Sequence, residues 1–104
     1  MIDAAVLEEI VRDEMGKAGV WPQNPWKPNK NTRNWLEERG FKMGYLTGSN
    51  NWDRCGDARP AWWEYDKEGF WRLSLRHRRG YLLIYIPKEM VERIAVFGAI
   101  PPLK

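Results

Sequence analysis

The sequence predicts an α+β fold: a mostly antiparallel sheet of about four strands, with helices packed on one of its faces. Three features predict it. An amphipathic segment lies near the amino end, alternating residues with turn signals occupy 61–86, and a second amphipathic segment follows. The length of 104 residues suits one domain, and no linker or repeat divides the chain, so we expect a single domain over 1–104.

The first helix is expected at 3–15, where apolar residues recur at helical spacing. Asp3 is suited to the N-cap position, because its carboxylate can accept a hydrogen bond from a free backbone N–H. Gly16 and Gly19 are expected to end this helix. The proline-rich stretch that follows, 20–31, is expected to be an extended surface segment.

A short middle helix is expected at 33–39, capped by Asn31 or Thr32 and closed by Gly40. The alternating residues of 41–46 then predict a strand. The carboxyl-terminal helix is expected to run from Pro87, which favours a first helical position, to Phe97.

The segment 61–86 predicts a meander of three strands joined by two tight turns. The first turn is expected at 67–69, with Gly69 in the left-handed position, and the second at Arg79 and Gly80. This register places Glu64 opposite Arg72. One face of the meander is then apolar and faces the core: Ala61, Trp63, Tyr65, Trp71, Leu73, Leu75, His77, Leu82, Ile84 and Ile86.

The other face of the meander is basic and aromatic, and we expect it to be open. Arginines can neutralise phosphates while flat aromatic rings stack on bases. Tryptophan, tyrosine and arginine also anchor protein partners, so the pattern fits either ligand. The residues expected to make contact are Trp62, Phe70, Arg72, Arg76, Arg78, Arg79, Tyr81 and Tyr85.

A long polar loop at 47–60 adjoins this face. Loops of this length are uncommon in compact domains and are often functional. Trp52, Arg54 and Arg59 are the side chains in it that suit a binding role. An equally weighted alternative is a structural loop held in place by Trp52 and local turns.

Composition excludes several classes of site. Cys55 is the single cysteine, which rules out an internal disulfide and a cysteine-rich zinc site. That usage suits a reducing compartment, so we expect a cytoplasmic protein. No apolar run approaches the length of a membrane span, and no secretory signal is evident, so no membrane partner is expected.

The residues offer little support for catalysis. Cys55 and His77 could form a nucleophile–base pair, but His77 falls on the predicted core face. The segment 64–67 resembles an acid-x-lysine nuclease motif with the lysine out of register. Acidic residues at Asp53 and Asp57 match no known cation-binding loop. No cofactor or metal is therefore expected.

Trp21 and Trp26 lie among prolines and could form a short ligand for a partner's groove. The simpler interpretation is that both rings pack this crossing segment onto the core.

The sequence thus favours a small binding protein without catalysis, with single-stranded nucleic acid or RNA as the first expected ligand class. The alternative is an inhibitor or adaptor of the phage or mobile-element type that binds a host protein. A small metal-independent RNase of the toxin type ranks third, because no acid–base pair is evident. The oligomeric state is not determined by the sequence.

Overall fold

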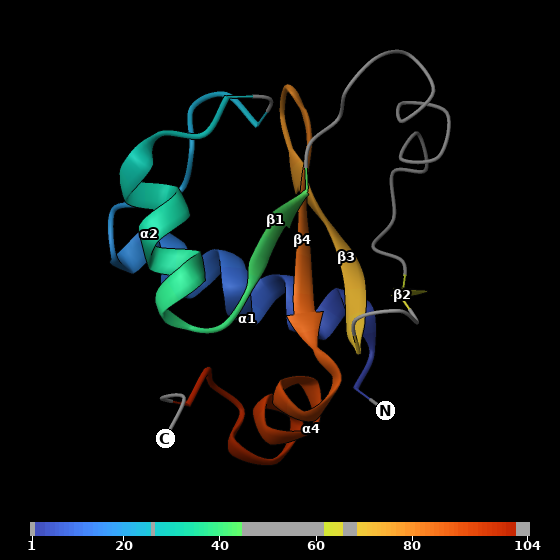
Figure 1. Ribbon diagram of the computed structural model, residues 1–104. Coiled ribbons are helices and arrows are strands. Elements are labelled where there is room, and N and C mark those ends of the chain that lie inside the picture. The colour runs from blue at the N-terminus through green and yellow to red at the C-terminus, as the bar shows by residue number, and fades with distance from the viewer. Residues whose placement is uncertain (1, 26, 45–61, 66–68, 102–104) are drawn as a thin grey trace.

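The computed structural model describes residues 2–25, 27–44, 62–65 and 69–101, which form an α+β fold (Figure 1). Its strands form one antiparallel sheet in the order β1-β4-β3-β2. The expected α+β class is confirmed. The elements in chain order are α1 (Ala4–Lys17), α2 (Lys30–Glu38), β1 (Lys42–Gly44), β2 (Trp62–Tyr65), β3 (Phe70–His77), β4 (Gly80–Pro87) and α4 (Lys88–Phe97).

The helices take different positions around the sheet (Figure 1). Helix α1 packs against β3, α2 against β1, and α4 against β4, where the chain leaves the sheet. The turn between β3 and β4 projects at the opposite end of the sheet from α4 (Figure 1). No helix in the described ranges has the length and apolar composition needed to cross a membrane.

The core lies between the expected apolar face of β3 and β4 and the helices. Burying this apolar surface is the main force that favours folding. The expected core positions on these two strands are confirmed for five residues with no exposed surface. They are Leu73, Leu75, Leu82, Ile84 and Ile86. Helix α1 adds Leu7, Val11 and Met15, α2 adds Trp35 and Leu36, and α4 adds Met90, Val91 and Ile94.

Two helices end in the same way. Gly19 after α1 has φ 72° and Gly40 after α2 has φ 79°, the left-handed conformation that glycine adopts without strain. In each case the residue after the glycine donates its N–H to a carbonyl in the last turn of the helix. Val20 donates to the Met15 carbonyl at 2.9 Å, and Phe41 donates to the Leu36 carbonyl at 2.9 Å. This is the Schellman arrangement, and it fixes the direction of the chain after each helix.

The N-cap of α1 is the expected residue, whereas that of α2 is not. Asp3 caps α1 as expected, its Oδ1 accepting the Ala5 N–H at 2.8 Å. The expected caps of the middle helix are wrong, because α2 starts at Lys30 and its cap is Asn29. Asn29 Oδ1 accepts the Thr32 N–H at 3.0 Å, so Thr32 lies inside the first turn.

The last helix begins without a loop. Pro87 ends β4 and also occupies the N-cap position of α4, one residue before its expected place in the helix. Gly98, with φ 68°, terminates the helix as expected. Phe97 was expected in the apolar stripe, but 63% of its surface is exposed.

The expected turn between β3 and β4 is displaced by one residue, from 79–80 to 78–79, which shifts the pairing of the two strands by two residues. His77 pairs with Gly80, so Arg78 and Arg79 form the turn and Gly80 begins β4. The His77 Nδ1 accepts the Arg79 N–H at 3.0 Å, which stabilises this turn in place of the expected one at Arg79 and Gly80. Side chains alternate with a period of two, so the shift leaves the two faces of this hairpin as expected.

The expected register between β2 and β3 is wrong by one residue. Glu64 pairs with Trp71 and Trp63 with Arg72, whereas Glu64 was expected opposite Arg72. The connection is therefore 66–69, one residue longer than expected.

Candidate functional site

Three arginines lie at one end of the β3–β4 hairpin. We call residues 76–79 the arginine turn. Arg76, Arg78 and Arg79 are all exposed, and His77 between them is half-buried. Because the turn places Arg78 and Arg79 at its two central positions, both side chains start from the outermost point of the hairpin. The result is a concentrated positive charge at one end of the molecule.

A buried carboxylate joins this turn to α1. Glu8 is only 4% exposed. Its Oε2 accepts the backbone N–H of Arg76 at 2.7 Å. Its Oε1 lies 4.0 Å from Nη2 of Arg76, whose side chain is half exposed. A half-exposed ion pair at that distance stabilises little, whereas the partly buried hydrogen bond to the backbone fixes the hairpin against the helix.

Removing this acceptor is expected to destabilise the protein. Glu8→Ala leaves the Arg76 N–H without its acceptor and should lower the free energy of unfolding by about 1–3 kcal/mol. Glu8→Gln retains an acceptor oxygen and should cost clearly less. Urea unfolding followed by circular dichroism measures both. Equal stability of the two variants would contradict a role for this hydrogen bond.

His77 connects the turn to the segment after α1. Its Nε2 lies 2.7 Å from the Pro22 carbonyl oxygen, which can only accept, so Nε2 is the donor. Its Nδ1 accepts the Arg79 N–H. The imidazole ring also stacks on Trp21, with 5.5 Å between centroids and 20° between planes. His77 therefore holds the arginine turn beside Trp21.

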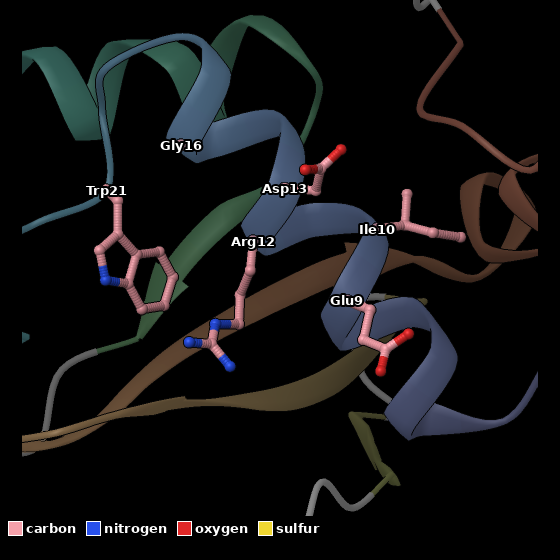
Figure 2. Close-up of a pocket in the computed structure, with 6 residues that line it drawn as sticks. All are labelled: Glu9, Ile10, Arg12, Asp13, Gly16 and Trp21. Atoms are coloured by element: carbon pink, nitrogen blue, oxygen red, sulfur yellow. The ribbon is translucent and has the colours of Figure 1, made fainter.

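Trp21 also contacts α1. The guanidinium carbon of Arg12 lies 5.2 Å from the centroid of the Trp21 ring, a favourable cation–π arrangement. Figure 2 shows the Arg12 side chain extending from α1 alongside the half-buried Trp21 ring. An arginine and a histidine thus flank one partly exposed aromatic ring.

Two adjoining concavities surround this ring, and we call them together the Trp21 groove. The larger, of about 670 Å³, runs along α1 (Figure 2). The smaller, of about 320 Å³, opens toward the arginine turn. They share Arg12 and Trp21. The larger is also lined by Glu9, Ile10, Asp13 and Gly16, and the smaller by Pro22, Gln23, His77 and Arg78.

The two concavities differ in charge. Glu9 and Asp13 bring carboxylates to the larger one. Lys17 pairs with Asp13, Nζ to Oδ2, at 2.9 Å on the exposed surface of α1. The hydrogen bond to Asp13, and then the charge of that carboxylate, raise the pKa of Lys17. Arg12 and Arg78 are the ionic residues of the smaller concavity, which is therefore the more positive of the two.

The face of the meander expected to be open is more covered than expected. Tyr81 is only 8% exposed and its neighbour Leu83 only 3%. Phe70, Arg72 and Tyr85 are half-buried. This face therefore offers less free aromatic surface than its sequence indicates.

Four further expected contact residues belong to β2 and to the loop before it. The backbone of Trp62 pairs with Leu73, and Trp52, Arg54 and Arg59 lie outside the described residues. Arg76, Arg78 and Arg79 are the expected contact residues that the structure brings together at an exposed end.

The site role of two residues was not predicted from the sequence. Trp21 packs against the core as expected, but it also stays partly exposed in the groove, and Arg12 was not among the expected contact residues. One signal was available, because Arg12 interrupts an otherwise acidic stretch of α1. Nothing in the sequence indicates that His77 would lie against Pro22, which is 55 residues away.

The structure also bears on the suggested catalytic and metal sites. Both ring nitrogens of His77 are engaged by backbone groups, so the ring is not poised as a general base. Cys55, Asp53 and Asp57 lie outside the described residues. Within the described ranges, no three His, Cys, Asp or Glu side chains come close enough to hold a metal ion.

Comparison of the chain with protein-family models, with curated proteins and with solved structures gives no match.

Proposed function

We propose that this protein binds nucleic acid through the arginine turn and the adjoining Trp21 groove. The observation that carries the proposal is the grouping of three exposed arginines beside a partly exposed tryptophan flanked by a fourth arginine. Guanidinium groups neutralise phosphates, and an aromatic ring offers a surface on which a base can stack. Both kinds of contact are available within one end of the molecule.

The site suits binding better than cleavage. The only histidine of the chain supports the turn through both ring nitrogens. Arginines alone can stabilise a phosphate, but cleavage of RNA also needs groups that move protons. Binding of a phosphate needs only the exposed arginines of the arginine turn and requires no group that transfers protons.

A second candidate is a protein partner, favoured by one observation at the other end of the molecule. Val96 and Phe97, at the end of α4, are 81% and 63% exposed. Large apolar side chains left exposed at neighbouring positions occur at protein contact surfaces. An inhibitor or adaptor could use this end of α4, away from the arginine turn (Figure 1).

Salt dependence is the test of nucleic-acid binding. The affinity for a fluorescein-labelled single-stranded oligonucleotide is measured by anisotropy over a series of NaCl concentrations. Each neutralised phosphate on a single strand contributes about −0.7 to the slope of log K against log salt. With three or four arginines in contact we expect a slope of roughly −2 to −3.

The outcomes separate the two candidates. A slope in the expected range supports nucleic-acid binding by the arginine turn. Absence of binding at low salt, or an affinity that does not respond to salt, would exclude it. The protein-partner alternative is then tested by Phe97→Ser, which should abolish capture of a host protein that survives nuclease treatment.

A further inference from the structure

We infer that Trp21 is the base-stacking platform of the interface, and that the ligand is a strand with unpaired bases rather than a duplex. This inference rests on the proposed function, and it names the residue and the strand type. Trp21 is the aromatic side chain common to both concavities.

The backbone on both sides of Trp21 is fixed. On one side, Val20 donates its N–H to the Met15 carbonyl at 2.9 Å. Its carbonyl accepts the buried Thr32 hydroxyl at 2.6 Å. On the other side, the Pro22 carbonyl accepts the His77 Nε2–H at 2.7 Å. These hydrogen bonds hold the backbone of Trp21 in place before a ligand arrives, and this lowers the entropic cost of binding.

Trp21 nevertheless stays partly exposed, although the residues before and after it are buried. A tryptophan that served packing alone would gain more free energy by burying the whole ring. The ring is also flanked by flat groups: the His77 imidazole stacks on it, and the Arg12 guanidinium lies near it. A base that stacks on Trp21 therefore replaces the Arg12 guanidinium or stacks on that guanidinium plane, because proteins stack unpaired bases on either kind of flat group.

The charged residues of the two concavities are expected to orient the bound nucleic-acid strand. Carboxylates of Glu9 and Asp13 in the larger concavity repel phosphates, and they can accept hydrogen bonds from base amino groups. Arg12 and Arg78 in the smaller concavity attract phosphates. The sugar–phosphate backbone is therefore expected to follow the side of the arginine turn, with the base on Trp21. Bases in a duplex are stacked on each other and cannot reach the ring.

The experiment compares strand types and ring variants. Wild type, Trp21→Leu and Trp21→Phe are titrated into fluorescein-labelled 12-mers: single-stranded DNA, single-stranded RNA and a DNA duplex of the same sequence. Leucine retains an apolar side chain but removes the ring face, and phenylalanine retains a ring. Because stacking contributes about 1–3 kcal/mol per base, Trp21→Leu should weaken single-strand binding by about 5- to 150-fold. Trp21→Phe should retain most of the affinity.

The matched control is Trp71→Phe, which alters a half-buried tryptophan of β3 outside the Trp21 groove. Circular dichroism and thermal melting confirm that each variant is folded. Tighter binding of either single strand than of duplex, lost in Trp21→Leu and kept in Trp21→Phe, supports the inference. Wild-type binding of duplex as tightly as of both single strands, or unchanged binding by folded Trp21→Leu, overturns it. Failure of wild type to bind any of the three oligonucleotides overturns the proposed function itself.

Discussion

Ile84→Ala is expected to lower the free energy of unfolding by about 2–5 kcal/mol. Ile84 has no exposed surface and lies in β4, between β1 and β3 in the sheet. Truncation removes buried apolar surface and leaves a cavity that the two neighbouring strands prevent from collapsing. Domains of this size have a total stability of about 5–15 kcal/mol, so the loss is a large fraction of it. Urea unfolding and thermal melting both measure the effect.

The matched control is Val96→Ala. Val96 is another aliphatic residue, but 81% of its surface is exposed, so its truncation should change stability by no more than about 0.5 kcal/mol. If Ile84→Ala and Val96→Ala unfolded at the same urea concentration, the placement of Ile84 and β4 at the centre of the core would be contradicted.

The double reversal Arg78→Glu with Arg79→Glu is expected to abolish nucleic-acid binding at moderate salt. Both residues are exposed at the centre of the turn, so each substitution should alter stability by no more than about 0.5 kcal/mol. The change replaces two positive charges by two negative ones beside the phosphates. Anisotropy titrations should show little or no binding, and any residual binding should have a shallower salt slope than wild type.

A second double variant separates local contact from net charge. Lys88→Glu with Arg93→Glu changes the total charge equally, but both residues belong to α4 at the opposite end of the sheet (Figure 1). This variant should bind nearly as tightly as wild type. Equal losses in both double variants would mean that binding follows net charge rather than the arginine turn.

Local sequence patterns predicted the helix ends well where the capping side chain or glycine acts within a few residues. Asp3, Gly40 and Gly98 occupy the expected terminal positions. The cap of α2 was wrong because Asn29, Asn31 and Thr32 are all good caps. Sequence alone does not choose among them, and Thr32 instead enters the core to bond with the Val20 carbonyl.

The register errors have a related cause. Trp62 and Trp63 are adjacent and both aromatic, so β2 has no apolar–polar alternation to define its faces. Gly69, with φ 71°, precedes β3 as expected, but it can end a connection of three residues or of four. In β3 apolar and polar residues alternate clearly, so the faces of this strand were predicted correctly although its pairing with β4 is shifted by two residues.

By itself, the sequence determined the α+β class, the core face of the β3–β4 hairpin and the concentration of arginines near its turn. These depend on periodicity and on neighbours along the chain, which a sequence displays directly. The tertiary structure decided that Arg12, Trp21 and the arginine turn lie together, and that Tyr81 is buried. Those relations join α1, the segment after it and a distant hairpin through Glu8 and His77. Contacts between distant segments leave no periodic trace in the sequence, because they depend on how the helices pack against the sheet.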